Sequence, residues 1–191
     1  MLVNVNKKHP GIRKKFLKPF LFNCNPNIPS ILGVIMACIS GYAFYINQAV
    51  AGALFFGFSG FFDILDGEIA KTYNRTSKLG DFLDHTFDRV ADVLVFVGVA
   101  MNPTVPMWIG LLTITFILLV SYMGTQFQAI TKKRLYGGIA GRSDRCLVLF
   151  IFGIGTLFFA ESLYYGTVII LALSAITFVQ RFHAGIKEIK N

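Results

Sequence analysis

The chain has 191 residues, of which 54% are hydrophobic and only 15% are charged. An ordinary soluble domain carries about 25% charged residues, so these few charges cannot cover a globule, and the composition predicts a single integral membrane domain. The formal net charge of +8 is a surplus that membrane proteins commonly collect in cytoplasmic loops, so it does not indicate nucleic-acid binding. Three widely spaced cysteines argue against a disulfide framework or a zinc site.

Six apolar stretches are each long enough to cross a hydrocarbon core, which takes about 20 helical residues. Short connections rich in turn residues separate them, and six spans leave no room for a separate soluble domain. The sequence therefore predicts an all-α integral membrane fold in which residues 28–191 form a six-helix domain. The six predicted transmembrane helices lie near 28–46, 49–72, 80–101, 105–130, 143–160 and 163–186.

Lysine and arginine residues occur in every second connection between the predicted spans and at the two ends of the chain. They precede the first span, surround the second and fourth connections and close the chain, while the other three connections contain none. Such residues stay on the cytoplasmic side, so both termini are expected there, in a multi-pass protein of the cell membrane. Residues 1–27 then form a cytoplasmic basic segment. Within it, residues 9–22 fit an amphipathic helix lying on an anionic membrane surface, kinked at Pro19, or alternatively a solvated basic tail.

Seven of the ten acidic residues fall in the second and third predicted spans, where each ionised side chain costs at least about 2.5 kcal/mol. In an antiparallel helix pair that turns near Thr76, Asp63 and Asp88 reach similar depths, and so do Asp66 and Asp84. Their spacings of three and four residues keep each pair on one helix face. We expect these four carboxylates to converge a turn or two inside the cytoplasmic surface.

A cluster of four carboxylates needs a countercharge. Hard divalent cations such as Mg²⁺ or Mn²⁺ supply it through oxygen ligands, and Mg²⁺ commonly recruits substrate phosphates, so the sequence predicts a metal site. One alternative is a set of interhelical salt bridges using Lys71, Lys78 and Arg89, although three bases cannot match seven acids. Outside the four central aspartates, Asp92 has the simpler alternative of pairing with Arg89. An alternative function for such a cluster is the cation path of an ion transporter.

The carboxylates stand in a fixed pattern from Asp63 to Asp88, which reads D-x2-D-G-x2-A-K-x8-G-x3-D-x3-D. This resembles the signature of the CDP-alcohol phosphatidyltransferases, D-x2-D-G-x2-A-R-x8-G-x3-D-x3-D. Every interval is kept. The one departure is Lys71, which keeps the positive charge of the family arginine but loses its bidentate fork. The six-span layout extends the resemblance over nearly the whole chain.

The resemblance implies an enzyme that displaces CMP from a CDP-linked lipid by an alcohol hydroxyl. In that family pattern Asp63, Asp66 and Asp84 would hold one or two Mg²⁺ or Mn²⁺ ions, while Asp88 would accept the hydroxyl proton and also reach a metal. The start of the first span resembles the family's Pro-Asn-x2-Ser/Thr pattern, although Ser30 could equally be a helix cap. The positions implied for CDP binding are Asn27, Asp66, Gly67, Ala70, Lys71, Ser77 and Gly80.

The acceptor alcohol is indicated by basic residues in the second half of the chain. Residues 138–145 resemble the G-x-A-E-R-x-E-R pattern of the phosphatidylinositol-phosphate and archaetidylinositol-phosphate synthases, with Gly141 in place of glutamate. The resemblance implies inositol 1-phosphate as acceptor. Gly124 departs from the lysine of that branch, and a glycerol phosphate acceptor is the alternative. The implied phosphate ligands, which could instead be topology anchors, are Arg142, Arg145 and Arg181.

Lipid and assembly are less constrained by the sequence. The branch uses diacylglycerol-based and archaeol-based lipids, so both CDP-diacylglycerol and CDP-archaeol stay open as donors. A homodimer is the family expectation, and Gly98 and Gly110 offer small-residue faces on neighbouring spans for helix packing.

Overall fold

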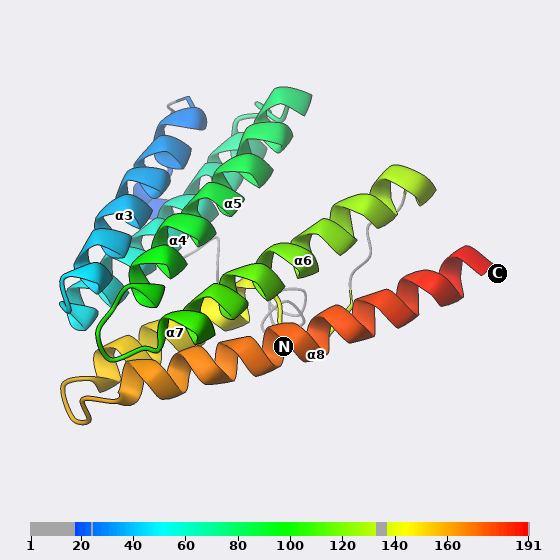
Figure 1. Cartoon of the computed structure of the whole chain (residues 1–191). Helices are drawn as coiled ribbons and strands as arrows, with labels where there is room; N and C mark the ends of the chain where they lie inside the picture. Colours follow the sequence, from blue (N-terminus) through cyan, green and yellow to red (C-terminus); the bar gives the residue numbers. More distant parts are fainter. Residues whose placement is uncertain (1–17, 24, 133–136, 191) are drawn as a thin grey trace.

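The structure, a computed structural model, describes residues 18–23, 25–132 and 137–190, which contain helices and no strand (Figure 1). Of the predicted surface helix over 9–22, the described part holds a short 3-10 turn, η1, and residues 9–17 lie outside the described range. The helices are η1 (Lys18–Phe20), α3 (Asn27–Tyr45), α4 (Ala49–Thr72), α5 (Lys78–Ala100), α6 (Met107–Thr131), α7 (Arg142–Gly155) and α8 (Ser162–Lys190).

Four of these helices, α3, α4, α6 and α8, are long and apolar enough to cross a membrane. Helix α5 has the length, with 23 residues, but its charged side chains lower its hydropathy. Helix α7 has 14 residues and is therefore about 21 Å long, shorter than a hydrocarbon core of about 30 Å. The structure thus places helices at all six predicted positions, and two of them differ from an ordinary span.

The predicted span over 143–160 is too long, because α7 ends at Gly155. The chain turns there: the backbone N–H groups of Leu157 and Phe158 donate to the carbonyls of Ile154 and Gly155. A methyl group on Gly155 would lie 2.4 Å from the hydroxyl oxygen of Ser162, so the two helices of this hairpin meet where only glycine fits. The predicted span was too long because the residues after Gly155 continue the apolar run.

Helix α3 packs along both α4 and α5, whereas α4 and α5 touch each other little. In Figure 1 these three helices form one group, and α6 and α8 run side by side in another. Helix α7 joins the groups by packing against α4 and α8. The space between α4 and α5 is thus left for side chains, and it holds Asp63, Asp84 and Asp88.

Two close helix contacts use glycines. A methyl group on Gly98 of α5 would lie 1.9 Å from the carbonyl oxygen of Gly41 on α3, and one on Gly110 of α6 would lie 2.3 Å from the Cβ of Ala100. Both contacts are within the chain. The sequence analysis assigned Gly98 and Gly110 to a dimer face, and that assignment is wrong because these glycines already pack against neighbouring helices.

Candidate active site

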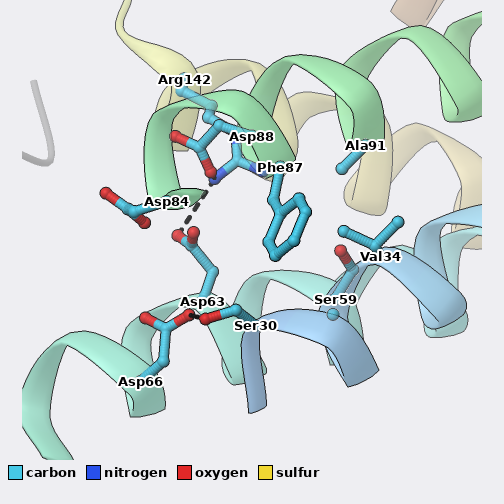
Figure 2. Close-up of a pocket in the computed structure, with 11 residues that line it drawn as sticks. Ser30, Val34, Ser59, Asp63, Asp66, Asp84, Phe87, Asp88, Ala91 and Arg142 are labelled. Atoms are coloured by element: carbon cyan, nitrogen blue, oxygen red, sulfur yellow. Dashed lines mark hydrogen bonds and ion pairs between the residues drawn. The ribbon is translucent and has the colours of Figure 1, made fainter. Parts of the chain in front are cut away.

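Three carboxylates from two helices meet between α4 and α5. Asp63 on α4 and Asp84 and Asp88 on α5 each offer one oxygen, and these oxygens all lie within 4.8 Å of one another (Figure 2). All three side chains are partly buried. The convergence of these three carboxylates, predicted from helix spacing, is therefore confirmed.

Asp66, the fourth predicted ligand, lies one turn further along α4 and is 7% exposed. Its Oδ2 accepts a short hydrogen bond from the Ser30 hydroxyl of α3, and it lines the same small cavity as the other three carboxylates. The sequence left open whether Ser30 caps a helix. It does not, because α3 begins at Asn27 and Ser30 reaches across to Asp66.

The donor set of Asp63, Asp84 and Asp88 fits a hard divalent cation. Carboxylate oxygens are the ligands that Mg²⁺ and Mn²⁺ prefer. Arg142 contributes one positive charge against these three carboxylates, so a net negative charge remains to attract a cation. The three oxygens are close enough together to be shared by one ion.

Arg142, at the first position of α7, lies on these carboxylates. Its Nη1 is 3.0 Å from Asp63 Oδ2 and also forms an ion pair with Asp88 (Figure 2). Its Nε donates to Asp92 Oδ1 at 3.2 Å. Arg142 was predicted to bind the acceptor phosphate. In the structure its partners are carboxylates on both α4 and α5.

The segment before α7 is fixed to α8, and this places Arg142. The backbone N–H of Ile139 donates to the Gln180 side chain at 2.9 Å, and that of Ala140 donates to the Thr177 hydroxyl at 3.2 Å. Gly138 has a φ of +105°, and a methyl group there would lie 2.3 Å from Thr177 Cγ2. Only glycine suits this turn. After these contacts with α8 the chain enters α7, whose first residue, Arg142, reaches the carboxylates.

A cavity of about 630 Å³ opens beside the carboxylates, between the start of α3, the end of α4 and the start of α5. Gly67 leaves space there, since a methyl group at this position would meet no described atom within 4 Å. Ser77 also caps α5, because its hydroxyl accepts from the backbone N–H of Gly80 at 2.9 Å. The lining includes every position that the resemblance implied for CDP binding, namely Asn27, Asp66, Gly67, Ala70, Lys71, Ser77 and Gly80.

A second cavity, of about 690 Å³, lies on the other side of Arg142 between α5, α6, α7 and α8. We call it the cationic cavity, because its lining includes the basic residues Lys78, Arg89, Arg142, Arg145 and Arg181. The three arginines that the resemblance implied for an acceptor phosphate thus share one cavity. Arg142 lines both this cavity and the small carboxylate cavity.

Arg145 and Arg181, which both line the cationic cavity, differ in their partners. Arg145 is 3% exposed, and its Nη1 has no hydrogen-bond partner among the described residues. Arg181 donates from Nε to the Gly137 carbonyl at 2.9 Å and from Nη1 to the Val120 carbonyl at 2.8 Å. A methyl group on Gly124 would lie 3.3 Å from Arg181 Nη1. The glycine that departs from the branch pattern therefore leaves room for Arg181.

Residues 23–180 match the sequence pattern of the CDP-alcohol phosphatidyltransferases. The chain belongs to this family. As a CDP-alcohol phosphatidyltransferase it is an enzyme, and this decides between the two classes left open by the sequence, transferase and cation transporter.

Curated relatives of this transferase include two archaetidylinositol phosphate synthases. That of Pyrococcus horikoshii is 31% identical over 165 residues, which cover 86% of this chain and 85% of the relative. That of Methanothermobacter thermautotrophicus is 28% identical over 153 residues, covering 80% and 78%.

Solved structures of the Mycobacterium tuberculosis phosphatidylinositol phosphate synthase are similar to this transferase. One contains CDP-DAG and matches with a TM-score of 0.77 at 25% identity, covering 91% of each chain. Another, in complex with manganese and citrate, has the same TM-score and identity and covers 91% of this chain and 87% of that one. The fold of the transferase is thus shared over nearly its whole length.

The sequence did not predict the contacts of three further side chains of the transferase site. Ser30 was considered as part of a family pattern or as a cap, and Asp92 was given a partner in Arg89 but none in α7. Arg75 was treated as a topology signal, yet it lines the 630 Å³ cavity together with Lys71. Helix spacing could not have indicated this position, because α4 ends at Thr72 and Arg75 lies in the connection to α5.

Proposed function

We propose that this transferase moves a phosphatidyl-type group from CDP-diacylglycerol or CDP-archaeol to inositol 1-phosphate and releases CMP. The observation that carries the proposal is the cationic cavity, which adjoins the carboxylate cluster through Arg142. A phosphorylated acceptor brings about two negative charges, and arginine is the side chain best suited to bind them. The names of the archaetidylinositol and phosphatidylinositol phosphate synthases that the chain resembles support the same acceptor.

The CDP-lipid would occupy the 630 Å³ cavity. Gly67 lets the ligand approach the backbone, and the positive charges of Lys71 and Arg75 line the same space. Asp63, Asp66, Asp84 and Asp88 would hold one or two Mg²⁺ or Mn²⁺ ions. Bound there, the metal would neutralise pyrophosphate charge and stabilise the departing CMP. A manganese complex of the M. tuberculosis synthase supports the choice of cation.

Asp88 is the proposed general base. It lines the carboxylate cavity and the 630 Å³ cavity, and it forms an ion pair with Arg142, which also lines the cationic cavity that would hold the acceptor. The carboxylate takes the hydroxyl proton while the hydroxyl oxygen forms a bond to the lipid-bearing phosphorus. The bond from that phosphorus to the CMP oxygen breaks, and CMP leaves with the electron pair. The product is a phosphodiester.

We propose that the chain crosses the cell membrane six times, with α7 and the apolar turn after it forming the fifth crossing, and that both termini and the active site are on the cytoplasmic side. The arginines and lysines of the described connections support this orientation. For residues 9–17 the surface helix stays a prediction. A homodimer stays a prediction as well, and light scattering in mild detergent measures it.

The test is release of labelled CMP from CDP-diacylglycerol and CDP-archaeol by purified enzyme, with a panel of acceptors. We expect turnover with inositol 1-phosphate and little with free inositol or serine. Turnover with glycerol 3-phosphate instead would move the chain to the alternative branch. Equal use of free inositol and its phosphate would reduce the three arginines to topology anchors and leave the transferase assignment intact.

A further inference from the structure

Asp92 is a buried carboxylate outside the motif. It lies on α5 one turn beyond Asp88, away from the start of the helix, and it is 3% exposed. A buried carboxylate is costly unless it is paired and hydrogen-bonded. It lines none of the three described cavities. Asp92 therefore acts in the site through the side chains that pair with it.

Three arginines surround Asp92. Its Oδ1 accepts from Arg142 Nε at 3.2 Å, and its Oδ2 lies 3.4 Å from Arg89 Nη1 and 3.9 Å from Arg145 Nη2. All three arginines line the cationic cavity. Without this carboxylate their like charges would repel one another in a poorly solvated region. Asp92 is thus the anion that keeps the three cations together.

The two arginines from α7 depend on Asp92 to different degrees. Arg142 has further carboxylate partners in Asp63 and Asp88, so Asp92 fixes its Nε while Nη1 reaches the cluster. For Arg145, Asp92 is the one anionic partner among the residues that the structure describes. Arg145 is almost fully buried, and its Nη1 has no hydrogen-bond partner in the same range. Asp92 therefore orients a guanidinium that keeps one donor free.

We propose that Asp92 is a positioning residue for acceptor binding: its buried carboxylate holds Arg142 and Arg145 at the wall of the cationic cavity, so that the acceptor's phosphate meets oriented donors. The proposal rests on the proposed function of this cavity. Asp92 touches neither substrate nor metal in this role and acts through the two arginines. Orienting the donors beforehand lowers the entropy that binding must overcome.

The test is the isosteric change Asp92→Asn. It removes the charge that three guanidinium groups share, so we expect the KM for the phosphorylated acceptor to rise about ten- to hundredfold, the range of a lost charge-assisted hydrogen bond. The KM for the CDP-lipid should change by less than about threefold, because Asp92 does not line the 630 Å³ cavity. Glu161→Gln is the matched control, since it removes one acid from the turn after α7, at the other end from Arg142.

A purely structural ion pair gives another result. In that case Asp92→Asn lowers thermal stability and the amount of active enzyme, with both KM values unchanged, and the proposal is overturned. If Asp92→Asn does not fold, the double variant Asp92→Asn with Arg145→Leu removes both charges and avoids an unpaired buried cation. Its acceptor KM should exceed that of Arg145→Leu alone, because Arg142 also loses the carboxylate that fixes its Nε. An acceptor KM equal to that of Arg145→Leu alone contradicts the proposal.

The same measurements separate this inference from the proposed acceptor. If the wild-type enzyme uses another phosphorylated alcohol, inositol 1-phosphate is the wrong acceptor, and the KM comparison is made with the alcohol that is used. A rise confined to that acceptor still supports the role of Asp92. An unchanged KM overturns it whichever acceptor the enzyme prefers.

Discussion

Arg142→Ala is the substitution that best tests how the two cavities are joined. Arg142 places a positive charge on Asp63 and Asp88, two of the three carboxylates that would share a metal. Two unit charges 4 Å apart repel by about 4 kcal/mol at an effective dielectric constant of about 20. About a third of that energy corresponds to a tenfold change in affinity. Removing Arg142 should therefore tighten Mn²⁺ binding about tenfold or more.

The same change should also weaken binding of the acceptor. Loss of a charge-assisted donor costs about 1.5–3 kcal/mol, which predicts a ten- to hundredfold higher KM for the phosphorylated alcohol. Free Mn²⁺, measured by electron paramagnetic resonance during titration of the purified protein, gives the metal affinity, and CMP release gives the KM. Arg181→Ala is the control, because Arg181 donates to the backbone carbonyls of Gly137 and Val120, and its loss should raise the acceptor KM alone. Weaker or unchanged Mn²⁺ binding in Arg142→Ala would refute this account of the arginine.

Three other predictions concern the carboxylates. Excess EDTA should abolish CMP release, and adding Mg²⁺ or Mn²⁺ should restore it. Full activity in the chelator would show that the reaction needs no metal at this site. Asp88→Asn should reduce turnover about 10²- to 10⁴-fold while sparing CDP-lipid binding, because it keeps the shape and deletes the proton acceptor. An equal loss of CDP-lipid binding, measured by calorimetry, would make Asp88 chiefly a metal ligand. Ser30→Ala removes the hydrogen bond to Asp66, worth about 1 kcal/mol, and should raise the CDP-lipid KM about fivefold; an unchanged KM would show that Asp66 is held without it.

The helices and the carboxylate cluster were within reach of the sequence because both depend on local spacing. Apolar runs gave helix positions that mostly fall within two residues of the observed bounds, and the intervals between Asp63, Asp84 and Asp88 gave their common depth. The end of α7 was missed because residues 156–160 continue the apolar run. Near this end the Ser162 hydroxyl of the next helix donates to the Phe152 carbonyl of α7 at 2.8 Å, and the apolarity of the sequence does not reveal such a contact.

The arginine contacts were out of reach for a different reason. Arg142 is 79 residues from Asp63 and 50 from Asp92, and no periodicity joins residues so far apart. The sequence could tell that this region is basic and the second and third spans acidic. It could not tell that one arginine would enter the acidic cluster while Arg145 stayed at its edge. That outcome follows from the way residues 138–140 are fixed to α8.

The contact between Gly41 and Gly98 gives α3 and α5 a fixed pivot. The two backbones meet so closely there that neither helix can slide or roll without separating. Gly98 is ten residues from Asp88, about 15 Å along α5, so a small tilt at the pivot becomes a larger displacement of the carboxylates at the far end of the same helix. The geometry of the carboxylate cluster would then be set at a contact whose two glycines line none of the three cavities.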